Sequence, residues 1–155
     1  MEIKVEKILQ NKNIGYKLIK LSEAAFSVSD VINNSGGTIN PNEICKTIIL
    51  RGKKSGKKFA VLLRGIDRLD FSKAKKIFGE EMAIATAEEV LEASGVEPGA
   101  VCPFLLNVAL FIDNKVLDLE TVNCGSGDHL YGIEFKLKDL LNNLDHQTID
   151  ISKTL

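Results

Sequence analysis

Residues 42–50, NEICKTIIL, have the hydrophobic pattern of a β-strand, interrupted by one lysine. Side chains alternate between the two faces of a strand, so Ile44, Lys46, Ile48 and Leu50 share a face. That face is apolar apart from Lys46. An unpaired buried charge is costly, so the ammonium must reach water or meet a polar partner in a pocket. Lys46 is therefore the first candidate functional residue.

The same kind of pattern predicts strands and helices along the rest of the chain. Strands are predicted at residues 16–21, 46–50, 59–63 and 82–85, in a hairpin over 109–119, and near 131–135. Helices are predicted at 2–12, after a Ser27 cap with Asp30 in the reciprocal position, at 71–78 after an Asp70 cap, after a Thr86–Glu89 capping box, and at 137–144. In the helix at 71–78 an apolar stripe is expected, made of Phe71, Ala74, Ile77 and Phe78.

Irregular alternation of helices with strands and tight hairpins predicts a mixed α/β (α+β) fold. No G-x-G-x-x-G follows a predicted strand, and no G-x-x-x-x-G-K-[ST] occurs, which argues against dinucleotide-binding and P-loop folds. The length of 155 residues suits one domain with a real core, so residues 1–155 are expected to form a single domain.

Composition and the N-terminus favour a cytoplasmic protein with no membrane association. The chain is 45% hydrophobic and 26% charged. No apolar stretch approaches the roughly 18 residues that a bilayer span needs. The N-terminal MEIKVEKILQNKN lacks the apolar core of a signal peptide.

The three cysteines show no C-x-x-C spacing and only two histidines are present, His129 and His146. We therefore expect no metal site and no cofactor. Cys45, Cys102 and Cys124 are read as small buried hydrophobes in preference to nucleophiles.

Basic residues concentrate in one segment although the net charge is −1. Ten of the twenty lysines and arginines lie between residues 51 and 76, where only two aspartates oppose them. Five of the ten, Arg51, Lys53, Lys54, Lys57 and Lys58, surround the glycine-containing tip of the hairpin formed by 46–50 and 59–63. Such a segment can contact RNA phosphates, and it can equally be a solvated face.

Two glycine-containing loops complete the candidate site. Gly99–Pro103 has the form G-x-x-x-P, and Gly125–Gly127 reads GSG. Glycine lets backbone N–H groups approach a ligand closely, and proline fixes the end of its loop.

A family resemblance rests on Lys46 before TIIL, on the segments RLDFSKAKKIFG, GVEPGAVCPF and FIDNKVLDLETV, on the glycine turn, and on IEFKLKDLL. With these features the chain resembles the YbaK/prolyl-tRNA synthetase-associated domain family. The resemblance covers nearly the whole chain. It implies a central, partly barrel-like mixed sheet with flanking helices, and hydrolysis of the ester bond of misacylated tRNA. Typical substrates of the family are cysteinyl- or alanyl-tRNA with the proline anticodon.

The resemblance also implies roles for individual residues. Lys46 is expected to be catalytic, orienting the substrate and stabilising negative charge on the ester carbonyl. Chemistry is expected to be assisted by a hydroxyl or thiol of the substrate. Substrate contacts are expected from Gly99, Ala100, Val101, Cys102, Pro103, Gly125, Ser126, Gly127 and His129. Leu105 and Leu106 are expected to add bulk near the aminoacyl pocket.

The expected partners are misacylated tRNA and, as a further candidate, prolyl-tRNA synthetase, with no role for DNA. Two other functions stay open. One is a tRNA- or partner-binding module of the same fold without catalysis. The other is a small-molecule esterase with a cysteine nucleophile, for which no nucleophile–base pair is evident.

Overall fold

The computed structural model describes residues 3–154. Its helices are α1 (Lys4–Asn11), α2 (Val28–Asn34), α3 (Phe71–Phe78), α4 (Ala87–Ser94) and α5 (Leu137–Asn143). Its strands are β1 (Tyr16–Lys20), β2 (Cys45–Gly52), β3 (Lys58–Arg64), β4 (Asp67–Leu69), β5 (Met82–Ile84), β6 (Leu110–Asp113), β7 (Thr121–Gly125), β8 (Tyr131–Lys136), β9 (Gln147–Ile149) and β10 (Ser152–Thr154). Short 3-10 helices lie at η1 (Pro41–Glu43), η2 (Pro103–Leu105) and η3 (Asn114–Asp118).

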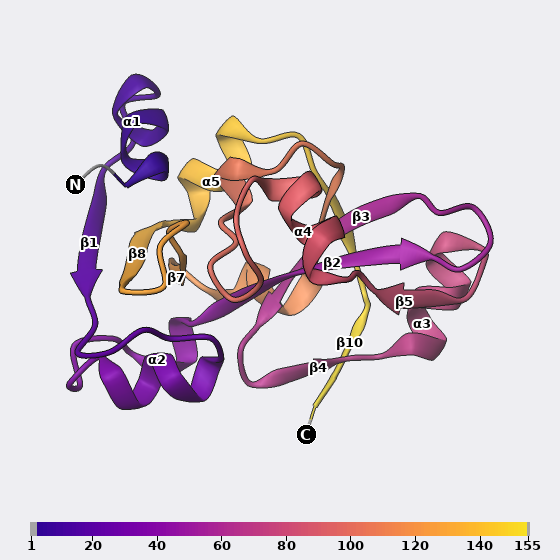
Figure 1. Cartoon of the computed structure of the whole chain (residues 1–155), viewed down its shortest axis with the longest axis horizontal. Helices are drawn as coiled ribbons and strands as arrows, with labels where there is room; N and C mark the ends of the chain where they lie inside the picture. The colour runs from indigo at the N-terminus through magenta and orange to yellow at the C-terminus, as the bar shows by residue number, and fades with distance from the viewer. Residues whose placement is uncertain (1–2, 155) are drawn as a thin grey trace.

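The strands form three sheets that mix parallel and antiparallel pairs (Figure 1). The largest has the order β5-β2-β3-β6-β9, the second β1-β8-β7, and the third pairs β10 with β4. β3–β6 and β6–β9 are parallel, whereas the other ladders are antiparallel. The mixed α/β class is confirmed. The sheet was predicted to be partly barrel-like, and the described strands do not close into a barrel.

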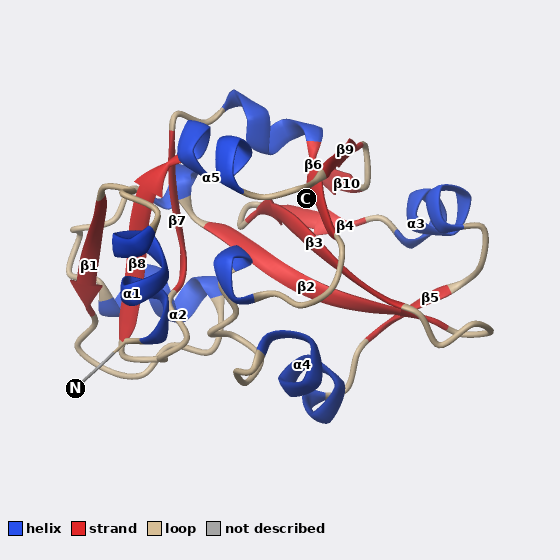
Figure 2. Cartoon of the chain, turned by 90° about the horizontal axis from the view of Figure 1, so that it is seen from above, coloured by secondary structure: helices blue, strands red, loops and turns tan. Residues whose placement is uncertain are grey.

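The β2–β3 hairpin has a layer on each face. Figure 2 shows α4 on one side of it and β4, β10 and α3 on the other. Alternation along the hairpin divides its buried side chains accordingly: Ile49 and Leu62 pack in the larger core, Leu50 and Leu63 in the smaller one. Each such side chain is almost fully buried and stabilises the fold by about 1.5–3 kcal/mol.

The predicted helix caps are confirmed. Ser27 accepts a hydrogen bond from Asp30 N at the start of α2. Thr86 and Glu89 form the reciprocal box of α4, which ends at Gly95 in the left-handed region. Asp30 differs in one detail, because its carboxylate accepts from Phe26 N, one residue before the cap. Helix α1 begins at Lys4, and residue 2 of its predicted range lies outside the described residues.

The apolar stripe predicted on α3 is only half correct. Ala74 is buried, and Phe78 stacks on Phe59 with ring centroids 4.6 Å apart. Phe71 and Ile77 are 45% and 37% exposed. The helix has just eight residues and packs on the smaller core through Ala74 and Phe78, so Phe71 and Ile77 stay at the surface.

The hairpin predicted over residues 109–119 does not form. β6 lies between β3 and β9 in the largest sheet, and η3 then carries the chain away to β7 in another sheet. The buried side chain of Val116 anchors η3 to the core, where a hairpin would have placed a solvent-exposed return strand. The alternating pattern was correct for β6 but could not show which strand was its partner.

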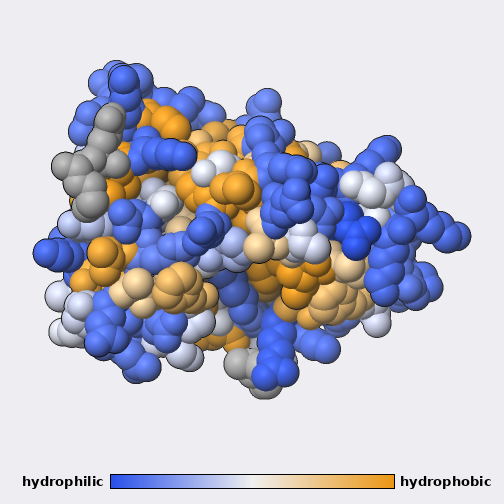
Figure 3. Space-filling model, in the orientation of Figure 1, coloured by the Kyte–Doolittle hydropathy of each residue, from blue (hydrophilic) through white to orange (hydrophobic). Residues whose placement is uncertain are grey.

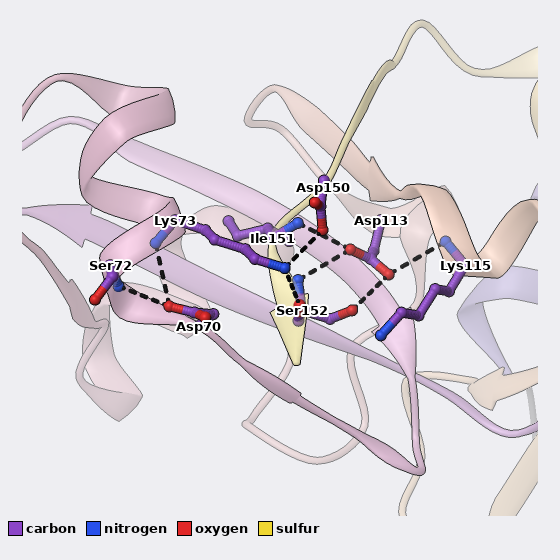
Figure 4. A network of polar contacts seen from close by, with 8 residues as sticks. All are labelled: Asp70, Ser72, Lys73, Asp113, Lys115, Asp150, Ile151 and Ser152. Atoms are coloured by element: carbon purple, nitrogen blue, oxygen red, sulfur yellow. Dashed lines mark hydrogen bonds and ion pairs between the residues drawn. The ribbon is translucent and has the colours of Figure 1, made fainter. Parts of the chain in front are cut away.

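The C-terminal strands β9 and β10 were not predicted, and a buried carboxylate holds them (Figure 4). Asp113 is fully buried. Its Oδ1 accepts from Ile151 N and Ser152 N at 2.9 and 3.0 Å, and its Oδ2 accepts from the Ser152 hydroxyl at 2.8 Å. Lys73 adds bonds to Asp150 and to the Ser152 carbonyl. β10 is thereby fixed beside β4.

Among residues 3–154, no helix is both long and apolar enough to pass through a bilayer.

We predict that Asp113→Asn lowers the free energy of unfolding by about 1.5–3 kcal/mol, the range for hydrogen bonds to a charged group. The asparagine side chain has one acceptor oxygen in place of two, so it cannot accept all these hydrogen bonds. Its NH₂ group would also face the N–H or O–H donors of Ile151 and Ser152. Urea unfolding should be compared with Asp145→Asn, which changes an exposed aspartate. Faster amide exchange at Ile151 and Ser152 is expected in the Asp113 variant. Equal unfolding free energies for the two variants would contradict this role.

Candidate functional site

A pocket of about 520 Å³ opens along the edge of β2. Its walls come from the segment before α2, from β2, from the loop at residues 98–101, from the end of β7, and from the turn leading into β8. A parallel bridge between Ile44 and Asn123 ties β2 to the second sheet at one end of the pocket. The site therefore lies where two sheets meet, within the common size range of small-ligand pockets.

Lys46 lines this pocket and has a polar partner, as its pattern required. Its Nζ donates to the main-chain carbonyl of Asp67 at 2.7 Å. Burial lowers the pKa of the Lys46 ammonium below its ordinary value, while Asp67 opposes the shift and Arg68 adds to it. The ammonium is thus half-buried, held by a neutral acceptor, and has two donor positions left for a ligand.

An ion pair fixes the carbonyl that holds Lys46. The Asp67 carboxylate is buried and accepts from Arg64 Nε at 2.8 Å and from Nη2 at 3.3 Å. This two-point contact closes the turn between β3 and β4 and restricts the orientation of the Asp67 peptide group. Thr154 of β10 pairs with Asp67 from the other side.

The Gly99–Pro103 loop contributes only part of its length to the pocket. Gly99 and Val101 line it, whereas Ala100, Cys102 and Pro103 are buried behind it. Gly99 has φ +91°, and a Cβ there would lie 2.9 Å from the Phe26 carbonyl oxygen. Glycine is therefore required at this position by both conformation and space.

The glycine turn, Gly125–Gly127, also has only some of its residues in the pocket lining, and the others are buried behind it. Gly125 lines the pocket and lies so close to Ala100 that a Cβ would be 2.7 Å from its carbonyl carbon. Gly127 N donates to Ala100 O at 2.8 Å, which ties the two loops together. Ser126 is fully buried and donates to the Tyr131 carbonyl at 2.6 Å. The structure therefore brings neither Ser126 nor Gly127 to the pocket lining.

His129 does line the pocket. Its ring stacks on Phe26, with centroids 4.3 Å apart, and its Nε2 lies 3.0 Å from the Pro98 carbonyl. Since a carbonyl can only accept, Nε2 carries a proton. Phe26 is 62% exposed at this rim and was not predicted.

Other lining residues were also missed, notably Thr47, Asn123 and Tyr131. The one available signal was the polar Asn123 inside the apolar strand sequence TVNCG. Leu105 and Leu106 were expected near the pocket, but they pack against the larger core and do not line it. The expectation that they add bulk there is wrong.

The cysteines are poorly suited to act as nucleophiles. Cys45, Cys102 and Cys124 are all buried, free thiols. Burial raises the pKa of the Cys45 thiol to about 12. The pKa of Cys124 is also raised, by its contact with Cys102 and by burial. A thiol with a raised pKa carries little of the reactive thiolate at neutral pH. Across residues 3–154, no three His, Cys, Asp or Glu side chains are grouped as metal ligands.

Acidic side chains from other elements approach the basic hairpin. Arg51 pairs with Glu89 at 3.2 Å, Lys53 with Glu81 at 3.7 Å, and Lys58 with Glu92 at 3.7 Å. Lys54 and Lys57 are exposed and form no ion pair with any residue in the described range 3–154. Figure 3 shows hydrophilic side chains gathered over this end of the molecule. The free positive charge of the segment is therefore smaller than the sequence suggested.

Residues 22–142 match the family model for the aminoacyl-tRNA editing domain. The chain is 35% identical over 104 residues to a proline–tRNA ligase of Dechloromonas aromatica, covering 61% of this chain and 18% of the ligase. It is 30% identical over 126 residues to that of Nautilia profundicola, covering 76% of this chain and 22% of the ligase. The chain thus spans about a fifth of the length of these ligases.

Shorter relatives match over most of their length. The uncharacterized protein YwhH of Bacillus subtilis is 28% identical over 104 residues, covering 66% of each chain. The crystal structure of hypothetical protein APE2540 superposes with a TM-score of 0.85 at 26% identity, covering 97% of this chain and 99% of the other. A proposed trans-editing enzyme for prolyl tRNA synthetase gives 0.81 at 25% identity, covering 97% and 95%.

We predict that Lys46 loses its proton below the ordinary lysine pKa of about 10.4. Burial disfavours the ammonium, so the charged form is complete at low pH and is lost as pH rises through the lowered pKa. NMR titration of ¹³C-methylated lysines measures this, with Lys46→Gln to assign the signal. A Lys46 midpoint at or above the ordinary value would contradict the half-buried placement.

Proposed function

The chain belongs to the aminoacyl-tRNA editing domain family, and from this premise we propose that it hydrolyses the ester bond of misacylated tRNA in trans. The observation that carries the proposal is the Lys46 ammonium, fixed by the Asp67 carbonyl inside a pocket of about 520 Å³. Small amino acids such as cysteine or alanine on the proline tRNA are the proposed substrates, and prolyl-tRNA synthetase is a proposed partner. The relatives among proline–tRNA ligases support the choice of the proline tRNA and of this partner.

Lys46 stabilises the negative charge that develops on the ester carbonyl oxygen as water attacks. A preorganised cation in a partly desolvated site is effective for this purpose, because the site needs little reorganisation during the reaction. We propose that the aminoacyl group lies beside Gly99, where the Phe26 backbone leaves no room for a Cβ on the loop. In this placement small side chains are favoured because large ones are excluded.

Within residues 3–154, no side chain that lines the pocket is placed as a general base. Of the pocket's ionisable groups within residues 3–154, Asp128 accepts from Leu130 N and His129 Nε2 faces the Pro98 carbonyl. The thiols of Cys45 and Cys124 have raised pKa values. These observations support a reaction in which a ribose hydroxyl or the thiol of a cysteinyl substrate supplies the missing group.

The hairpin tip is proposed to contact tRNA away from the ester. Lys53 follows Lys46 by seven positions, just past the end of β2, which places it about 23 Å from Lys46 along the extended strand. Arg51, Lys53, Lys54, Lys57 and Lys58 form the proposed contact surface. Lys54 and Lys57 are its strongest members, because neither forms an ion pair within the described residues. The Glu80 carboxylate lies at the same tip, where it accepts from the Lys54 N–H, and its hydrogen bonds, together with the charge of Lys57, lower its pKa.

We predict that Lys46→Ala lowers single-turnover deacylation by about 100–1,000-fold, the effect of removing an oxyanion-stabilising group. Lys46→Arg should also be impaired, because a planar guanidinium does not fit the place of a compact ammonium. Thermal melting checks the fold, and Lys138→Ala is the matched control on the exposed face of α5. Wild-type turnover by Lys46→Ala would overturn the catalytic assignment. If the wild type binds tRNA but does not deacylate it, the non-catalytic binding module is favoured.

We predict that Lys54→Gln with Lys57→Gln weakens tRNA binding and flattens its salt dependence. Each lost phosphate contact reduces the slope of log affinity against log salt by about 0.7–0.9. The matched control is Lys7→Gln with Lys12→Gln, two exposed lysines at α1, which lies far from the hairpin in Figure 1. Equal slopes for the wild type and the hairpin variant would show that the tip is only a solvated face.

A further inference from the structure

One stretch of β2 in the pocket lacks a neighbouring strand on one side. On its other side β2 pairs with β3 along its whole length. On the pocket side it meets β7 only through the Ile44–Asn123 bridge and β5 only over 50–52, with one more bond from Ala85 N to Ile49 O. The edge around Thr47 is left open between these two contacts.

The main-chain groups of Thr47 point toward this open edge. Ile44 O accepts from Gly65 N, and Gly52 N donates to Lys57 O, so even-numbered residues of β2 bond toward β3. Successive residues of a strand point their N–H and C=O groups in opposite directions. The Thr47 N–H and C=O therefore face the pocket. Its hydroxyl oxygen is also buried and has no hydrogen-bond partner within residues 3–154.

Asn123 supplies a second acceptor in the lining of the same pocket, where it bridges Ile44 at one end of the open edge. Its side chain is 2% exposed, and its Nδ2 faces two carboxylates, Glu134 Oε1 at 3.2 Å and Glu43 Oε1 at 3.5 Å. The two carboxylates fix the orientation of the amide, because a carbonyl oxygen turned toward them would be repelled. Oδ1 is left buried in the pocket lining, and no described residue donates to it. A buried unpaired acceptor costs about 1–3 kcal/mol.

We propose that Asn123 Oδ1 and the Thr47 carbonyl bind the α-ammonium group of the aminoacyl ester, an inference that rests on the proposed function. An ammonium has three donors and no acceptor, so it matches a site made of acceptors. The neighbouring carboxylates of Glu43 and Glu134 favour its positive charge. Lys46 leaves β2 on the face opposite to Thr47, and the ester carbonyl is bound there. The amine and the carbonyl of one amino acid thus meet opposite sides of a single strand edge.

This site makes a free α-amino group a requirement for binding. An N-acylated amino acid, such as the last residue of a nascent peptide on tRNA, has one amide N–H where the site expects three donors. It also places an acyl group against the Asn123 wall. The protein should therefore accept aminoacyl esters and reject peptidyl esters that end in the same amino acid.

Binding of three non-hydrolysable probes tests the proposal without relying on turnover. They are adenosine carrying a 3′-amide-linked alanyl, N-acetylalanyl or propionyl group, and affinity is measured by calorimetry. We expect the wild type to bind the alanyl probe about 10–100-fold more tightly than the other two, the range for a charge-assisted hydrogen bond. Asn123→Leu, of similar volume, should bind the alanyl and propionyl probes alike. Asn143→Leu, an exposed change at the end of α5, is the matched control and should keep the preference.

Equal wild-type affinity for the alanyl and propionyl probes would overturn the amine site, as would no binding of the alanyl probe. If Asn123→Leu fails to fold, Asn123→Ala serves instead, since it also removes Oδ1 and inserts no bulk, and the preference should fall. A preference kept in both variants would also overturn it. Deacylation of tRNA without any amine preference would leave the proposed function standing and remove this inference alone. Amine-selective binding without deacylation would support the amine site and contradict the proposed hydrolysis.

Discussion

The hydrogen bond from Lys46 to the Asp67 carbonyl is the interaction on which the site depends. It explains how a lysine is tolerated on an apolar strand face, and it aims a cation into the pocket. The carbonyl is held in turn by the Arg64–Asp67 ion pair and by β10, which the buried Asp113 anchors. Arg64 and Asp113, which do not line the pocket, are thus linked to the position of the Lys46 ammonium.

The pocket is a consequence of interrupted strand pairing. β2 leaves β7 after the Ile44 bridge and meets β5 only near its other end, so the main chain between them is free to bind a ligand. Two glycine-containing loops close the opening. Gly125 lies against the Ala100 backbone of the other loop and Gly99 against the Phe26 backbone, so neither glycine has room for a side chain. A cation, unpaired acceptors and restricted space are thus combined in a pocket of about 520 Å³.

Local patterns predicted local structure well and long-range pairing poorly. The caps at Ser27, Asp70 and Thr86 and the β2–β3 hairpin were predicted because neighbours in sequence make them. The partner of β6 and the strands β9 and β10 depend on Asp113, whose bonds reach residues far along the chain. Lys46 stood out because its charge conflicted with its neighbours. Asn123 and Thr47 are ordinary polar strand residues, and only the open edge gives them significance. The count of basic residues in the hairpin likewise could not show that some of them form ion pairs with glutamates elsewhere in the chain.

The central claim is that this pocket hydrolyses small aminoacyl esters, and the most direct test is a deacylation panel. The wild-type protein is incubated with proline tRNA charged with alanine, cysteine, serine, proline or phenylalanine, and ester loss is measured against the uncatalysed rate. The alanyl or cysteinyl ester should be cleaved fastest and the phenylalanyl ester not at all. Cleavage of none of them, or equal cleavage of the alanyl and phenylalanyl esters, would contradict the account.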